Sequence, residues 1–303
     1  MRRPADDDHL PLRSRTHGRT DRCILHHHRC RDGRYDTSRP DRSRPACRGR
    51  IEPVRAANPR PVRFSIGQSA PGSGCPPASL EWQGFYTIGS SGHEGNAVVA
   101  GALRPTDPAL LHYRSGAFFL QRARQVRGSN PLRDVLLGVV AATEEPMSGG
   151  RHKVFGRHDL NIIPQTSTIA SHLPRAVGVA FSIARAAKLN VLSAWPEDAI
   201  AVCSFGDASA NHSTAIGAIN TAIHSAFQGL PLPLLFVCED NGIGISTKTP
   251  KGWICANFGN REGLEYFTVD GSDLPMAYAT AKHAADWVRR HRKPAFLHLR
   301  TVR

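Results

Sequence analysis

Long hydrophobic runs are missing from this sequence of 303 residues. No apolar stretch approaches the roughly 18 to 20 residues that a membrane-spanning helix needs. The first residues also lack the apolar segment of a signal peptide, and the acidic run Asp6–Asp8 is unlike a transit peptide, which is poor in acids. The seven cysteines are odd in number and scattered, so a disulfide framework is not expected. We therefore expect a cytoplasmic protein with no membrane partner.

Lysine is absent from residues 1–80, although this segment holds 17 arginines and 8 acidic residues and carries most of the net charge of +14. It is rich in proline and has almost no hydrophobic period. Such a segment cannot bury enough apolar surface to offset the entropy lost on ordering. We expect residues 1–80 to form a disordered basic tail. The interpretation we favour is an unstructured extension, translated from a GC-rich frame ahead of the true start.

Two other interpretations of the tail stay open. Arginines could neutralise phosphates in an arm that binds nucleic acid, but acidic residues are interleaved with them and stacking aromatics are nearly absent. The stretch CILHHHRC (Cys23–Cys30) has residue types that ligate zinc. Its spacing matches no closed four-ligand site. The disordered extension therefore stays the interpretation that we favour over these two.

From residue 81 onward the sequence is typical of a folded α/β domain, which we assign to residues 81–303. The apolar runs at 198–205 and 232–239 are typical of parallel strands buried on both faces. Helical spacing of small and apolar residues lies before, between and after them, as in LPRAVGVAFSIARAAKL. This alternation predicts a doubly wound, mostly parallel sheet.

Polar side chains follow both of these strands. Asp207 lies in the turn FGDAS, directly before a predicted helix, and Asn241 lies in the turn EDNGI. Ligands of open parallel sheets bind at the carboxyl ends of strands, and a helix start attracts phosphate. Hard oxygens beside a phosphate suit Mg²⁺. Asp207 alone could equally be a helix N-cap, but the second turn favours a metal–diphosphate site.

The stretch GDASANHSTAIGAIN, followed by LLFVCEDNGIGIST, resembles the thiamine-diphosphate motif of the 2-oxo acid dehydrogenase E1 α-subunits. The resemblance extends over roughly residues 84–303, through FYTIGSSGHEGNAVVAGALRPTDPALLHYRSG and PQTSTIASHLPRAVGVA, and is nearest to branched-chain and actinobacterial members. It implies a three-layer thiamine-diphosphate-binding fold with thiamine diphosphate and Mg²⁺ as cofactors. It also implies an oxidoreductase that decarboxylates a 2-oxo acid, branched-chain or pyruvate-like, and passes the acyl group to a lipoyl group.

The resemblance implies a role for each matching residue. Asp207, the side chain of Asn241 and the carbonyl of Ile243 would ligate Mg²⁺. Arg114, beside Tyr113, would pair its guanidinium with the diphosphate through charge-assisted hydrogen bonds. The backbone that would approach the diphosphate belongs to Gly206, Ala208 and Ser209.

Ser167 and Ile169 would contact the aminopyrimidine and thiazolium region of the cofactor. His152, in the loop GRHKVFG, is the candidate catalytic histidine. Ala208 departs from the family, which has glycine there, and its methyl group would strain the turn if this position needs a positive φ.

The resemblance also implies partners. An E1 β-subunit would supply the proton-relay glutamate in a heterotetramer, and an E2 lipoyl acyltransferase would accept the acyl group. The chain stops at LHLRTVR, where family members continue into a Gly-His loop, so we expect a C-terminally incomplete domain. Two alternatives remain: an inactive truncated fragment or assembly-only subunit, and a nucleic-acid-associated protein that binds through its basic tail. Which 2-oxo acid is used does not follow from the sequence.

Overall fold

The computed structural model describes residues 89–151 and 154–302. The predicted tail, residues 1–80, and its boundary with the folded domain lie outside the described residues. Within the described part, no helix is long and apolar enough to cross a membrane.

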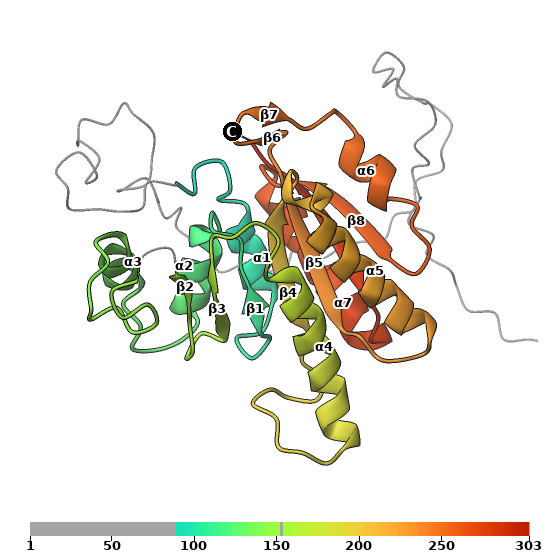
Figure 1. The fold of residues 1–303 in the computed structure, drawn as a ribbon, viewed down its shortest axis with the longest axis horizontal. Coiled ribbons are helices and arrows are strands. Elements are labelled where there is room, and N and C mark those ends of the chain that lie inside the picture. The colour runs from blue at the N-terminus through green and yellow to red at the C-terminus, as the bar shows by residue number, and fades with distance from the viewer. Residues whose placement is uncertain (1–88, 152–153, 303) are drawn as a thin grey trace, which may run out of the picture. The chain divides into compact units, whose positions relative to one another are not determined.

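The described chain is built on a seven-stranded sheet in the order β2-β3-β1-β4-β5-β9-β8 (Figure 1). Every neighbouring pair is parallel except β2 and β3. The strands are β1 (Ala109–Leu110), β2 (Val154–Arg157), β3 (Ile162–Thr166), β4 (Ala201–Gly206), β5 (Leu234–Asp240), β8 (Glu265–Asp270) and β9 (Ala295–Arg300). A separate antiparallel ribbon follows β5 and consists of β6 (Ile243–Gly244) and β7 (Thr247–Lys248).

Helices cover both faces of this sheet, which makes three layers (Figure 1). One face is covered by α1 (Asn96–Ala102), α2 (Gly116–Arg124) and α7 (Leu274–His291), and the other by α4 (Leu173–Lys188), α5 (Ser213–Phe227) and α6 (Trp253–Phe258). Helix α3 (Pro131–Val139) extends beyond α2, and a 3₁₀ turn, η2 (Ser209–Asn211), links β4 to α5. The mostly parallel α/β fold expected from the sequence is confirmed.

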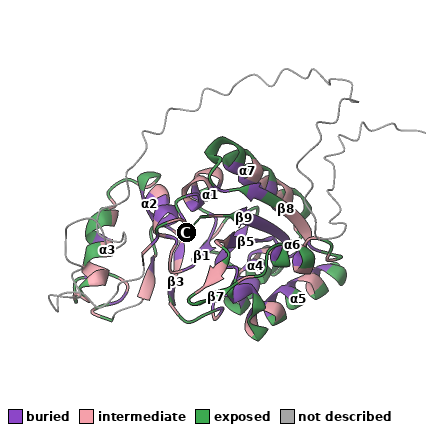
Figure 2. Ribbon diagram, turned by 90° about the horizontal axis from the view of Figure 1, so that it is seen from above, coloured by how far each residue is buried: buried purple, intermediate pink, exposed green. Residues whose placement is uncertain are grey.

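The central strands are buried on both faces, as their continuous apolar runs predict. Along β4, Cys203 and Phe205 point into the core beneath α4 and α5, whereas Val202 points into the core beneath α1 and α7. Figure 2 shows these strands as buried, between helices whose outer faces are exposed. Small residues such as Ala215 and Ala222 line the inner face of α5 and bring that helix close to the sheet.

Helix ends follow the local sequence signals. Asn130 caps α3 by accepting a hydrogen bond from the backbone N–H of Arg133, with proline at the next position. His212 caps α5 through Nδ1, which accepts from the N–H of Thr214 at 3.2 Å. Asp207 therefore caps neither η2 nor α5, so the helix-cap explanation of this aspartate does not hold.

Candidate cofactor and metal site

Four neighbouring strands end at the same edge of the sheet, and the candidate residues follow those ends. The strands lie in the order β3-β1-β4-β5 and run parallel to one another. Their carboxyl ends therefore bring four loops together, although the loops come from widely separated parts of the sequence. The candidate residues in these loops are Ser167 and Ile169 after β3, Tyr113 and Arg114 after β1, Asp207, Ala208 and Ser209 after β4, and Asn241 and Ile243 after β5.

Asp207 is a buried carboxylate at the end of β4, with 1 % of its surface exposed. Burial raises its pKa, with a smaller contribution from nearby Asp240, and a hydrogen bond from Thr249 partly offsets this rise. The donor in that bond is the Thr249 hydroxyl group. A carboxylate held in this way gains from a cation, because desolvation without a positive partner is costly.

The turn that follows β5 folds directly against Asp207 and Ala208. The backbone N–H of Thr249 donates to the carbonyl of Gly242 at 2.9 Å, which closes the ribbon of β6 and β7 over the end of β4. Asn241 Oδ1 accepts from the N–H of Ile243 at 3.2 Å. The carboxylate, amide and carbonyl oxygens of Asp207, Asn241 and Ile243 are the hard donors that Mg²⁺ prefers. The donor set therefore fits a magnesium ion.

Ala208 fits this turn without backbone strain. Its φ of −65° is open to any residue, so the glycine of the family is not required here for a positive φ. The opposite position is a glycine: a Cβ built on Gly244 would lie 2.2 Å from the Cβ of Ala208. The methyl group of Ala208 thus occupies space that a side chain at 244 would otherwise fill.

The residues expected around the organic part of a cofactor lie beside a cavity. Tyr113 and Ser167 line a cavity of about 80 Å³, together with the buried side chain of Gln165. Arg114 donates from Nη1 to the carbonyl of Gly89 at 2.6 Å, and its guanidinium lies 5.6 Å from the Tyr113 ring centroid. Ile169 is 39 % exposed and lies in the turn that precedes α4. His152, the candidate catalytic histidine, lies outside the described residues.

A buried hydrogen-bond network lies directly beneath the proposed metal ligands. Glu239, the penultimate residue of β5, accepts hydrogen bonds from His93 at 2.7 Å, Asn96 at 3.1 Å and Ser115 at 3.0 Å. Burial opposes ionisation of this carboxyl group, yet its pKa is lowered, because the hydrogen bonds from His93 and Asn96 favour the ionised form. The network joins β5 to the start of α1, through His93 and Asn96, and to the start of α2, through Ser115.

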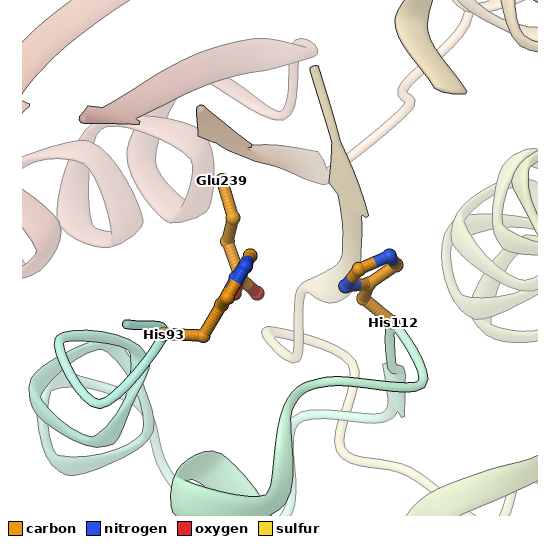
Figure 3. A group of neighbouring side chains, drawn as sticks. All are labelled: His93, His112 and Glu239. Atoms are coloured by element: carbon orange, nitrogen blue, oxygen red, sulfur yellow. The ribbon is translucent and has the colours of Figure 1, made fainter. Parts of the chain in front are cut away.

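His112 completes this buried group. Figure 3 shows His93 beside Glu239, with His112 set apart from them. Burial lowers the pKa of His112 to about 3, so its imidazole is neutral near pH 7. One ligand atom from each of the three side chains lies within 4.8 Å of the others, a spacing that could suggest a metal centre. Both ring nitrogens of His93 already have hydrogen-bond partners, Glu239 and Asn241, so in this arrangement His93 has no nitrogen left for a metal ion.

Sequence reasoning missed several polar residues at this site. Thr249, Glu239 and His93 all contact the proposed ligands or support them. The position of Glu239, at the end of an otherwise apolar strand, is a signal that could have identified it. His93 was not distinguishable from other histidines, because its partner lies 146 residues away in the sequence.

Comparison with known proteins places the chain in a family. It belongs to the dehydrogenase E1 component family, whose model matches residues 81–303. Among curated proteins it is similar to the 2-oxoisovalerate dehydrogenase subunit alpha of Caenorhabditis elegans (mitochondrial), with 31% identity over 66% of this chain and 43% of that protein. The protein of the same name from Bacillus subtilis is 29% identical over 70% of this chain and 60% of that protein. The chain thus spans about half the length of these relatives.

Solved structures with a similar arrangement include two transketolases. A transketolase mutant from Pichia stipitis matches with a TM-score of 0.47 and 17% identity, over 68% of this chain and 32% of that one. The Campylobacter jejuni enzyme matches with a TM-score of 0.47 and 16% identity, over 67% and 32% of the two chains.

Proposed function

We propose that this chain is the E1 α-type subunit of a 2-oxo acid dehydrogenase complex and that it binds magnesium and thiamine diphosphate. The observation that carries the proposal is the pairing of buried Asp207 with the turn from Asn241 to Thr249. Membership of the dehydrogenase E1 component family supports the reaction class. The curated relatives named 2-oxoisovalerate dehydrogenase subunit alpha support a branched-chain 2-oxo acid as substrate.

In this proposal the chain's own residues bind and orient the cofactor. Asp207, Asn241 and the carbonyl of Ile243 would hold Mg²⁺ beside the diphosphate. The guanidinium of Arg114, which donates to the carbonyl of Gly89 in this structure, would pair with the diphosphate through charge-assisted hydrogen bonds. The backbone of Gly206 to Ser209 approaches the same group. When bound, thiamine diphosphate supplies a carbon nucleophile and an electron sink for decarboxylation.

The remaining assignments complete the proposed subunit. Ser167 and Ile169 contact the ring system of the cofactor, next to the cavity lined by Tyr113. His152 is the candidate acid–base group. An E1 β-subunit completes the active site in a heterotetramer, and an E2 lipoyl acyltransferase accepts the acyl group.

Thermal unfolding with and without the cofactors tests this proposal. At a hundredfold excess over Kd, a ligand stabilises the native state by about 2.7 kcal/mol. For a domain of this size, that raises the unfolding midpoint by roughly 5–11 °C. We expect this rise in the wild type with thiamine diphosphate and Mg²⁺, and none in Asp207→Asn, which lacks the charged ligand. Asp198→Asn is the matched control, because Asp198 precedes the opposite end of β4 and pairs with Arg104 at the surface.

The possible results separate the proposed function from its alternatives. A wild type that the cofactors do not stabilise would refute cofactor binding. A rise that persists in Asp207→Asn would refute the ligand assignment. If the cofactors bind but addition of a β-subunit restores no decarboxylation of 3-methyl-2-oxobutanoate, an assembly-only subunit or an inactive fragment is the better description.

A further inference from the structure

Asn241, a proposed metal ligand, contacts a buried histidine on its other side. Asn241 Nδ2 lies 3.3 Å from His93 Nε2, and His93 Nδ1 lies 2.7 Å from Oε2 of Glu239. Both His93 and Glu239 are buried, at 2 % and 0 % of side-chain exposure. His93 therefore connects the exposed end of the site to a fixed carboxylate in the interior.

The contacts define which end of the Asn241 amide faces which way. Oδ1 accepts from the backbone N–H of Ile243, so Nδ2 must be the atom that faces the imidazole. An amide nitrogen only donates, so His93 Nε2 accepts and carries no proton. The proton of the neutral ring then resides on Nδ1 and is donated to Glu239. Asn96 and Ser115 also donate to the Glu239 carboxylate, which holds it in place as the acceptor for His93.

We propose that His93 is a positioning residue that orients the amide of Asn241 so that its oxygen, and not its nitrogen, is presented to the magnesium ion. This inference rests on the proposed function. A reversed amide would present an NH₂ group to the cation, and that group has no lone pair to offer. Glu239 in the core fixes His93, and His93 in turn fixes the orientation of the Asn241 amide.

Two substitutions separate the two contacts of His93. His93→Asn puts an amide near the place of Nδ1, so it retains a donor to Glu239 but does not reach Asn241. His93→Gln puts its amide near the place of Nε2, so its oxygen accepts from Asn241 while the Glu239 contact is lost. A purely structural role predicts that His93→Gln is the more damaging change, because Glu239 is the buried charge. An orienting role predicts the opposite order for metal binding.

The measurement is Mn²⁺ affinity in the presence of saturating thiamine diphosphate, followed by electron paramagnetic resonance on the full chain. Loss of a residue that orients a metal ligand typically weakens affinity about 10- to 100-fold. We expect that loss for His93→Asn and a change of less than about threefold for His93→Gln. Circular dichroism and the unfolding midpoint without metal report whether each variant is folded.

A second background makes the test specific. In Asn241→Asp either carboxylate oxygen could serve as the ligand, so no orientation needs to be chosen. Because neither oxygen can donate to Nε2 of His93, the contact is already lost in this background, and we expect His93→Asn to weaken Mn²⁺ affinity by less than about threefold. A full loss in this background, or unchanged affinity in His93→Asn alone, would overturn the inference and leave the proposed function intact. A wild type that binds no Mn²⁺ would overturn both.

Discussion

The contact between Ala208 and Gly244 makes a quantitative prediction for the substitution Gly244→Ala. The added Cβ would lie 2.2 Å from the Cβ of Ala208, whereas carbon atoms pack best at about 3.5–4.0 Å. One of the two turns must therefore move by more than about 1 Å. Both atoms are attached directly to the backbone, so no flexible side chain can absorb the shift. Over-packing of this kind costs about 1–3 kcal/mol.

Thermal unfolding of four proteins measures this cost: the wild type, the two single variants and the double variant. For a domain of this size, 1 kcal/mol corresponds to about 2–4 °C, so Gly244→Ala should lower the midpoint by roughly 2–12 °C. Ala208→Gly alone should cost no more than about 1 kcal/mol, through backbone entropy. The double variant moves the methyl group to the opposite turn and should be more stable than Gly244→Ala alone.

The reasoning is refuted if the two substitutions are additive, because contacting residues should show a coupling energy of about 0.5–3 kcal/mol. Gly217→Ala is the matched control. Gly217 lies on α5, and a Cβ added there would have no neighbouring atom within 4 Å. The change should therefore be neutral or should stabilise the protein by up to about 1 kcal/mol. The same four proteins also test the site, since a displaced turn moves Ile243 and should weaken Mg²⁺ binding in Gly244→Ala.

Two further predictions concern buried basic side chains and their partners. Burial lowers the pKa of His172 to about 4 from an ordinary 6.5, and its Nε2 lies 2.7 Å from the carbonyl of Ser204. Between these pH values the unfolded state binds the extra proton, so the free energy of unfolding should fall as pH drops, by up to about 1.4 kcal/mol per pH unit. Urea titrations should show a smaller dependence of this free energy on pH in His172→Gln. An equal dependence would contradict the assignment. Arg122→Met should cost roughly 2–4 kcal/mol in the same assay, with exposed Arg124→Met near zero, because the Arg122 guanidinium donates to the carbonyls of Pro105, Asp107 and Leu160.

The strands and helices that the sequence predicted are those with a long, regular pattern. Strands β4 and β5 are uninterrupted apolar runs, and α4, α5 and α7 have clear helical spacing, so local physics defines them. Strand β1 has two residues, Ala109 and Leu110, and β3 contains Pro164. Segments this short carry no period of their own. They become strands because of their neighbours in the sheet, β1 beside β4 and β3 beside β1, which no local pattern reveals.

The candidate site divides in the same way. Asp207 and Asn241 could be predicted because each directly follows a recognisable strand, and the adjacency of β4 and β5 then brings their turns together. The support beneath them depends on pairs that are remote in sequence, such as His93 with Glu239. The fit of Ala208 depends on a glycine that faces it across a different turn. Contacts of this kind arise from the tertiary fold and leave no mark on neighbouring residues.

Two carboxyl groups at the ends of adjacent strands have pKa values shifted in opposite directions. Glu239 is fully buried, yet its pKa is lowered, because the hydrogen bonds from His93 and Asn96 favour the ionised carboxylate. Asp207 is buried too, but its pKa is raised, because desolvation outweighs the hydrogen bond from Thr249. The protein's own hydrogen-bond donors therefore favour the ionised form of Glu239, whereas the donors around Asp207 do not offset the effect of its burial. Environments that push two neighbouring carboxyl groups apart in pKa are typical of functional sites, and this difference supports the roles proposed above, a metal ligand for Asp207 and a supporting group for Glu239.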